Sequence, residues 1–203
     1  VKDGYTGGEY GETIKKFYVT FKHGTVVVNP ENPGKPDEPI NPDDPNGSKY
    51  PSDSANLNKD VTHTIHYVYA DGTTAKPSHT QTLTFKGSGV IDKVTGQYVV
   101  LDENGKVILG DDGEPIEGKL VWNANVSDPK FTEVSSPTIT GYTPDKANVA
   151  GTKVTHDMPS NVIVVTYTAN DADAKVIFVD KTTGKELEAV MLNGKYGDII
   201  NYS

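Results

Sequence analysis

Six prolines recur at every third position between residues 30 and 45, within the stretch NPENPGKPDEPINPDDPNG (29–47). Proline lacks a backbone N–H and fixes φ, so this stretch cannot be a helix interior or a central strand. A period of three matches polyproline II, which has three residues per turn and no internal hydrogen bonds. The pattern therefore favours a stiff polyproline II-like connector, with the acidic residues on its other edges opposing collapse. A flexible, disordered tether is the alternative.

Strand signals dominate the segments on either side of the prolines. FYVTFKHGTVVV (17–28) alternates between apolar and polar residues before a His-Gly turn. The β-branched run VTHTIHYVYADGTT (61–74) ends in Asp71-Gly72, a strong hairpin signal, and TQTLTF (80–85) is its return strand. Residues 96–122 predict a strand, a turn, a second strand, a second turn and a further strand.

NVIVVTYTA (161–169) is apolar on both faces, which predicts a central strand that is covered on both sides. One short helix is predicted within 127–137, where Asp128 is a candidate N-cap and Pro129 would take the first helical position. The fold class is therefore mainly β with little helix.

Composition excludes several classes of function. The formal net charge of −9 opposes binding to nucleic-acid phosphates and to anionic membranes. No apolar run approaches the roughly 20 residues that a membrane span requires. The chain has no cysteine, which excludes disulfides and thiolate metal sites.

No catalytic constellation emerges from the sequence. The five histidines are interpreted as exposed or edge residues: His23, His63, His66, His79 and His156. His63 and His66 would point to opposite faces of a strand, so they cannot bind one metal together. Ser88 lies in a Gly-Ser-Gly run without a neighbouring base and is interpreted as a loop residue. We therefore expect a protein that is not an enzyme and has no cofactor.

Carboxylates cluster between residues 102 and 114: Asp102, Glu103, Asp111, Asp112 and Glu114. Calcium takes six to eight oxygen ligands, so these turns are candidates for a calcium site. Solvated hairpin turns, which also recruit Asp, Asn and Gly, are the simpler interpretation, and no metal ligand is assigned.

The 11 tyrosines fall into two groups. Four sit in apolar patterns and are predicted to be core or half-buried: Tyr67, Tyr69, Tyr142 and Tyr167. Four others lie near turns or linkers, where exposed rings could stack on sugars or anchor a protein partner, although local packing also explains them. These are Tyr5, Tyr10, Tyr50 and Tyr98. No ligand-binding residue is assigned.

Several of these stretches, taken in order, resemble one known family. VTHTIHYVYADGTTAKPSHTQTLTF, IDKVTGQ, the single Trp122, SSPTITGYTPDKANV and VIVVTYTA are similar to the MucBP, or mucus-binding-protein (Mub-type), repeats of lactic-acid-bacteria adhesins. Residues 174–203 resemble the opening of the family's companion β-grasp (ubiquitin-like) module, and residues 3–28 resemble its close. Residues 99–120 look longer than the usual sequence at that place.

The resemblance implies an elongated tandem of β-grasp-related modules whose terminal members are incomplete. Residues 1–28 would close one module, 29–60 would connect, 61–170 would form a complete MucBP-like module, and 171–203 would open the next. The two partial ends could complement each other within one chain or between chains, which would give end-to-end or swapped self-association.

The implied function is a non-enzymatic adhesion repeat within a longer exported protein, displayed outside the cell on a bacterial cell wall. Its implied partners are mucin glycans or glycoprotein, and immunoglobulin as a second option. The alternative is a structural stalk repeat that extends other binding domains from the cell wall.

Overall fold

The computed structural model describes residues 23–201, and these are almost entirely β-strand, turn and loop. Tyr5, Tyr10 and most of the expected closing segment 1–28 lie outside the described residues. The one helical element in the described range is the single 3-10 turn η1 (Ser52–Ser54). The prediction of a mainly β chain is confirmed.

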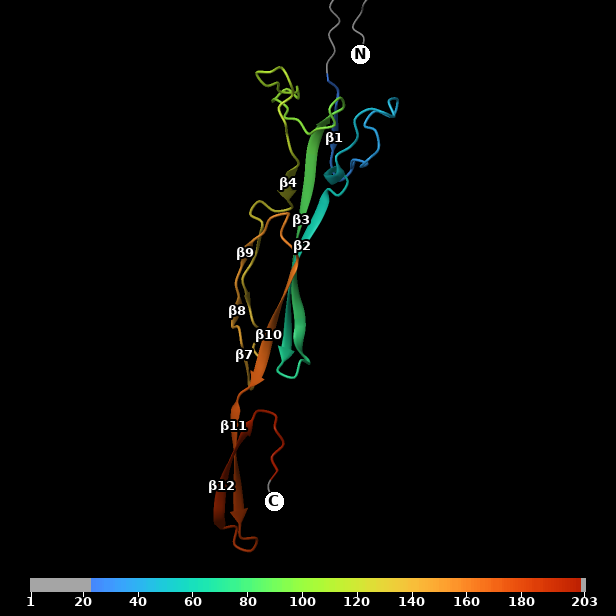
Figure 1. Ribbon diagram of the computed structural model, residues 1–203. Helices are drawn as coiled ribbons and strands as arrows, with labels where there is room; N and C mark the ends of the chain where they lie inside the picture. The colour runs from blue at the N-terminus through green and yellow to red at the C-terminus, as the bar shows by residue number, and fades with distance from the viewer. Residues whose placement is uncertain (1–22, 202–203) are drawn as a thin grey trace, which may run out of the picture. The chain divides into compact units, whose positions relative to one another are not determined.

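Twelve strands follow one another along the described chain. The strands are β1 (Thr25–Val28), β2 (Asn58–Tyr69), β3 (Thr74–Asp92), β4 (Val121–Ala124), β5 (Lys130–Phe131), β6 (Val134–Ser135), β7 (Tyr142–Pro144), β8 (Asn148–Val149), β9 (Thr152–Lys153), β10 (Asn161–Ala169), β11 (Asp171–Val179) and β12 (Glu186–Lys195) (Figure 1).

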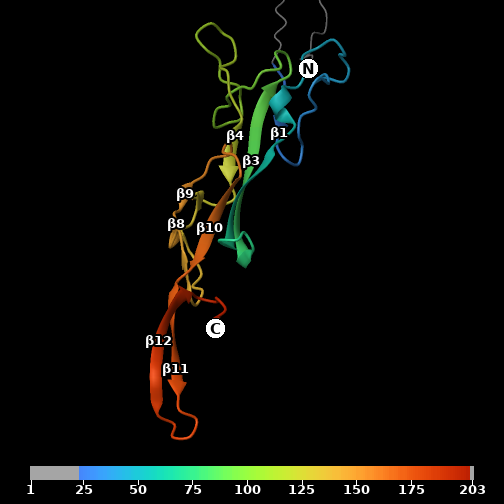
Figure 2. The same ribbon diagram turned by 60° about the horizontal axis from the view of Figure 1, so that its bottom comes forward.

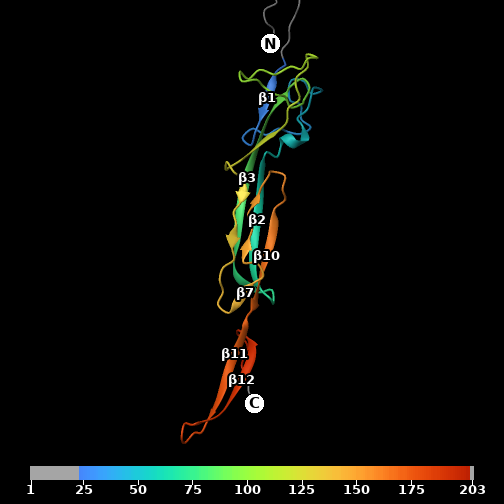
Figure 3. The ribbon, with the colours of Figure 1, turned by 90° about the vertical axis from the view of Figure 1, so that its left-hand side faces the viewer.

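The long hairpin β2–β3 is the centre of the main sheet, whose order is β1-β3-β2-β10-β7, with β4 also pairing β3. The predicted Asp71-Gly72 turn is present, since Gly72 has a φ of 85° and Asp71 Oδ1 accepts the Thr73 N–H at 2.9 Å. Strand β10 runs parallel to β2, whereas β7 pairs antiparallel on its other edge. Figure 3 shows β2 between β3 and β10.

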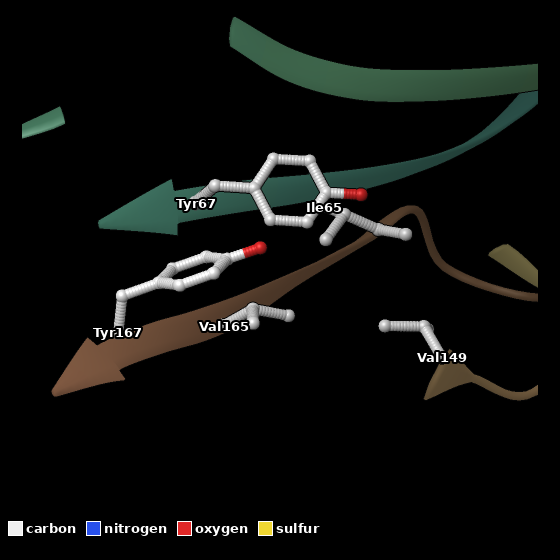
Figure 4. Packing of buried hydrophobic residues seen from close by; sticks show 5 residues of the cluster. All are labelled: Ile65, Tyr67, Val149, Val165 and Tyr167. Carbon is white, nitrogen blue, oxygen red and sulfur yellow. The ribbon is translucent and has the colours of Figure 1, made fainter. Parts of the chain in front are cut away.

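The chain divides into two compact units, 1–59 with 84–125 and 60–83 with 126–203, so β2 and β3 each contribute to both. The core of the second unit is a cluster of five buried side chains, shown in Figure 4: Ile65, Tyr67, Val149, Val165 and Tyr167. They lie on alternate positions of β2 and β10, as period-two patterning requires, and β8 supplies Val149 from the covering segment. Tyr67 and Tyr167 meet edge to face, with ring centroids 6.4 Å apart.

The strand predicted at 161–169 is present, but the prediction that both of its faces are covered is wrong. β10 is hydrogen-bonded on both edges, but only one of its faces is covered. Val165 is fully buried, whereas Val162 and Val164 on the other face are 61% and 46% exposed. Apolar β-branched residues favour a strand whether or not both faces are covered, so composition alone could not settle the second face.

The helix predicted within 127–137 is wrong, because the segment holds the short strands β5 and β6. Phe131 pairs with Thr152 and Val134 with Val149, so both apolar side chains reach the sheet from an extended backbone. Phe131 is buried and stacks on the His63 ring, with centroids 5.2 Å apart. Asp128 forms an ion pair with Lys130 at 2.8 Å.

The expected polyproline II rod is also wrong. Residues 29–57 fold back on themselves, with backbone hydrogen bonds from Glu38 to Lys35 at 3.0 Å and from Ile40 to Ser48 at 2.9 Å. Asp37 has a φ of 66°, which polyproline II does not allow. Ile40, the one apolar residue among the prolines, is buried in the core of the first unit with Val28, Leu57 and Ile91. Burial of Ile40 stabilises the folded conformation of this loop, and the proline spacing gives no sign of that contribution.

Strands β11 and β12 form a separate two-stranded hairpin, paired from Asp171–Lys195 to Val179–Glu186 (Figure 2). Its turn is closed by Asp180 Oδ1, which accepts the Thr182 and Thr183 N–H groups at 2.8 and 2.7 Å. The backbone hydrogen bond from Thr183 is the main reason that the pKa of Asp180 lies below its usual value. Across residues 23–201, none of the helical structure is long and apolar enough to cross a membrane.

Candidate functional site: the hairpin groove

The first unit carries an open groove of about 820 Å³ between its strands and residues 97–118, the excursion between β3 and β4. We call this groove the hairpin groove. The excursion is the yellow-green loop between β3 and β4 in Figure 2. It overlaps residues 99–120, the stretch that the resemblance led us to expect to be longer than usual. The lining residues are Val27, Ser88, Gly89, Val90, Val99, Val100, Leu101, Glu117, Gly118, Lys119 and Val121.

Backbone hydrogen bonds fix the excursion against β3. Val99 N–H donates to the Val90 carbonyl at 2.9 Å, and Asp92 N–H donates to the Gln97 carbonyl at 2.9 Å. The returning strand closes on the outgoing one, since Gly118 N–H donates to the Tyr98 carbonyl at 2.7 Å. The floor of the groove is therefore ordered backbone rather than a loose loop.

Two tight turns shape the excursion at the places that the sequence predicts. Asp102 Oδ1 accepts the Asn104 and Lys106 N–H groups at 2.9 and 2.8 Å, and Asp112 Oδ1 accepts the Glu114 N–H at 3.1 Å. These carboxylates close separate turns, which accounts for the acidic cluster. Among the described residues, no group of three or more His, Asp or Glu side chains could hold a metal ion.

Glycine is required where the excursion touches itself. A Cβ on Gly118 would lie 2.6 Å from the Val99 carbonyl oxygen and 2.7 Å from its carbonyl carbon. Real Cβ contacts are not that short, and a backbone neighbour cannot rotate away as a side-chain tip can. Gly118 therefore holds the two arms of the excursion at a distance that no other residue permits.

The groove is mainly apolar, and Glu117 and Lys119 are the only charged side chains among its lining residues. Val121 on β4 is 55% exposed and Val27 on β1 is 49% exposed, although both are large apolar residues on paired strands. Ile116 and Leu109, which are also exposed, continue the apolar surface along the excursion. An exposed apolar cluster of this kind on a protein surface is typical of a contact site.

Tyr98 closes one end of the excursion rather than offering a free ring. Its hydroxyl donates to Asp53 Oδ1 at 3.0 Å, and its ring lies against Gly89, where a Cβ would be 2.8 Å from two ring carbons. Burial, followed by the hydrogen bond to Asp53, raises the pKa of Tyr98 well above its usual value.

A raised tyrosine pKa means that the folded state prefers the neutral phenol. The contribution of Tyr98 to stability is therefore fully present below about pH 10, the pKa of an unfolded tyrosine, and is lost as the pH rises above it. We expect the first unit to lose less stability in Tyr98→Phe than in the parent chain when the pH is raised from 8 to above 10. Denaturant unfolding monitored by Trp122 fluorescence at pH 8 and above pH 10 measures this. An equal alkaline loss in both proteins would contradict it.

The other tyrosines lie as follows. Tyr67 and Tyr167 are buried and Tyr69 and Tyr142 are half-buried, which confirms that prediction. Tyr50 and Tyr98 are partly buried against the core of the first unit, so local packing explains them. Trp122 also packs there, and Lys59 Nζ lies 4.5 Å from the centroid of its ring.

Three of the described histidines, His23, His63 and His66, make side-chain polar contacts within the fold. His63 and His66 point to opposite faces as predicted, but His63 is buried, and its Nδ1 lies 2.7 Å from Asn161 Oδ1. The expectation of exposed histidines is therefore wrong for His63. His23 pairs with the fully buried Asp92 at 2.5 Å. Ser88 lies on β3 opposite Val121, in a regular strand rather than in the predicted loop.

Sequence reasoning missed the groove residues Val27 and Val121. The available signal was the extra length of residues 99–120, which marked the excursion without saying which strands it faces. The groove offers apolar side chains, ordered backbone and two charges on an open surface. The fold and the groove together define a mainly β module with an open, largely apolar surface groove and no enclosed pocket at this place.

The family follows from comparison with known proteins. Residues 52–171, more than half of the chain, match the family model described as the Muc B2-like domain. The chain therefore belongs to the Muc B2-like domain family, and the resemblance to MucBP repeats is confirmed. The comparison with curated proteins gives no match.

Several solved structures are similar to this chain, and three of them are described here. Mub-RV is 26% identical over 75% of this chain and 63% of its own, with a TM-score of 0.48. The type 2 repeat of the mucus binding protein MUB from Lactobacillus reuteri is 26% identical over 83% and 73%, with a TM-score of 0.41. The MucBP domain of an adhesion protein from Pediococcus pentosaceus is 29% identical over 55% and 98%, with a TM-score of 0.35. The chain thus spans somewhat less than two thirds of Mub-RV.

Proposed function

We propose that this chain is a mucus-binding adhesion repeat, which attaches a bacterial cell surface to mucin glycoprotein. The observation that carries the proposal is the match of residues 52–171 to the Muc B2-like domain. The proposed location, outside the cell on the cell wall, and the absence of an enzymatic role follow from the same family membership.

The hairpin groove is the proposed contact surface. At a net charge of −9 the chain repels other anionic polymers at long range, so attachment to an acidic glycoprotein depends on short-range contacts. The groove supplies such contacts, because its exposed valines offer apolar area to the C–H faces of sugar rings and to peptide. Glu117 and Lys119 can add hydrogen bonds at its rim.

The domain limits are part of the proposal. Residues 61–170 would form the complete module, which lies within the matched range 52–171. Residues 29–60 would connect it to the module that residues 1–28 close, and this connector is not a free strut, because Val28 and Ile40 share the core of the first unit and β1 pairs with β3. Residues 171–203 would open the next module. The β11–β12 hairpin leaves Ile177, Leu187 and Met191 exposed, as expected of strands that await the rest of a module, and self-association through the partial modules would cover them.

The test is a binding series with the 203-residue chain on immobilised mucin, deglycosylated mucin and immunoglobulin. We expect binding to mucin, with loss on deglycosylation if sugars are the ligand. Binding to immunoglobulin would add the second partner. No binding to any of the three would overturn the adhesion proposal and favour the spacer repeat.

Val121→Asp tests the groove itself. A carboxylate at this apolar contact would have to be desolvated on binding, so we expect mucin affinity to fall roughly tenfold or more, with little change in folding. Val179→Asp is the matched control, because Val179 on β11 is 56% exposed, against 55% for Val121. Equal affinities for the two variants would show that mucin contacts another surface.

A further inference from the structure

Three tyrosines from separate elements meet in the second unit beyond the end of β10. Tyr69 ends β2, Tyr142 begins β7, and Tyr196 follows β12. The rings of Tyr69 and Tyr142 have centroids 4.8 Å apart, and those of Tyr142 and Tyr196 are 5.8 Å apart in an edge-to-face arrangement. Aromatic pairs in this range contribute about 0.5–1.5 kcal/mol beyond the burial of their area.

The ring of Tyr196 packs directly against the backbone of Gly141. A Cβ on Gly141 would lie 2.2–2.4 Å from three ring carbons of Tyr196, so the ring rests directly on the glycine backbone. Gly141 also has a φ of 80°, a conformation that side-chain-bearing residues rarely adopt. Both the backbone conformation and the ring contact therefore require glycine at this position.

Hydrogen bonds tie the same segments together through Asn170. The Asn170 N–H donates to the Gly141 carbonyl at 2.8 Å, and the Tyr196 N–H donates to the Asn170 carbonyl at 2.9 Å. The Thr143 hydroxyl donates to Asn170 Oδ1 at 2.6 Å. Asn170 is the only residue between β10 and β11, so it is also the covalent link between the sheet and the hairpin (Figure 1).

A one-residue link between two strands leaves their relative direction to two backbone dihedrals. Contacts on either side of the link therefore decide whether the hairpin moves with the sheet. Tyr196 remains 45% exposed, so burial of apolar area does not by itself explain where its ring lies. Its ring contacts with Gly141 and Tyr142 add side-chain packing between the hairpin and the sheet beside the link itself.

We propose that Gly141 and Tyr142 form a docking socket for Tyr196, and that this contact locks the β11–β12 hairpin to the sheet of residues 61–170. The partner that fits the socket is an aromatic ring presented by a tight turn after the second strand of such a hairpin. If residues 171–203 open the next module, the socket is the interaction surface that fixes one module to its successor.

The sequence around Tyr196 forms the turn that presents the ring. Asp198 Oδ2 accepts the Lys195 N–H at 2.8 Å, and Gly197 has a φ of 88°. The same pattern of glycine, charged residue, tyrosine, glycine and acidic residue occurs twice in the chain, as GKYGD (194–198) and GEYGE (8–12).

The proposal is tested by NMR on the full 203-residue chain with Tyr196→Ala, and with Tyr196→Phe as the matched control that keeps the ring. In the parent chain and in Tyr196→Phe we expect Gly141 Hα to show a ring-current shift, and the amides of β10 and β11 to report one tumbling time. Tyr196→Ala should abolish the shift, give the hairpin amides a shorter tumbling time, and speed exchange of the residue 196 amide by about tenfold or more.

Gly141→Ala provides a second route to the same state, since its methyl group would displace the ring. Unchanged amide shifts around the second unit's buried cluster, at Ile65 and Val165, would show that the sheet remains folded in each variant. Independent tumbling of the hairpin in the parent chain would overturn the proposal. Unchanged relaxation in Tyr196→Ala would overturn it as well, because another contact would then hold the hairpin. Neither result depends on mucin binding.

Discussion

Tyr167→Ala is expected to lower the free energy of unfolding of the second unit by about 3–5 kcal/mol, the usual cost of truncating a buried aromatic residue. Tyr167 is 0% exposed and belongs to the cluster in Figure 4, where its ring lies beside that of Tyr67. Its loss removes the largest fully buried side chain and leaves a cavity between β10 and the segment that covers it. Amide hydrogen exchange across β2 and β10 measures the loss.

Tyr167→Phe separates the ring from its hydroxyl. The hydroxyl donates to the Pro137 carbonyl at 2.5 Å, and one buried hydrogen bond is worth about 1 kcal/mol. We therefore expect Tyr167→Phe to cost much less than Tyr167→Ala. If Tyr167→Ala left the protection of β2 and β10 unchanged, the packing described for this core would be wrong.

The strands of this fold could be predicted because their signals are local. The alternation in residues 61–74, the Asp71-Gly72 turn and the return strand at 80–85 all lie within one hairpin, and β2–β3 follows them closely. Hairpin pairing depends on a turn and on neighbouring side chains, both of which a single stretch of sequence displays. The turns at Asp102 and Asp112 were predictable for the same reason.

The errors come from contacts that are distant in sequence. Phe131 and Val134 have a spacing that a helix would satisfy, but their partners Thr152 and Val149 lie about 15–20 residues further along. A segment with one candidate cap and few helix formers has little intrinsic preference, so the sheet partners decide its conformation. The groove is a stronger case, because Val27, Val90, Val99 and Val121 come from separated segments that pairing with β3 brings together.

In the proline stretch, burial of one apolar residue, Ile40, decides the backbone conformation against the one that the proline spacing predicts. The spacing of three describes the prolines correctly, yet polyproline II keeps every side chain in solvent and gains nothing from an apolar one. Ile40 gains roughly 1.5–3 kcal/mol by burial, and the turns at Asn29, Asp37 and Asp44 let the chain bring it to the core. The segment is therefore part of the first unit and not only a connector.

Ile40→Ala tests that conclusion and should lower the free energy of unfolding of the first unit by about 2–5 kcal/mol, through lost burial and the cavity that remains. Ile40 is 5% exposed and packs in one cluster with Val28, Leu57 and Ile91. Trp122 packs against the same cluster and is the chain's single tryptophan, so its fluorescence reports unfolding of this core directly.

Ile40→Val is the graded control, with an expected cost of about 0.5–1.5 kcal/mol, because it removes one buried methyl group. The ratio of the two losses distinguishes a packed side chain from one that only restricts the backbone. In an extended rod Ile40 would face solvent, and both substitutions would leave the Trp122 transition within about 0.5 kcal/mol of the parent. A neutral Ile40→Ala would therefore favour the extended rod, whereas a loss of the expected size would show that residues 29–57 contribute Ile40 to the core of the first unit.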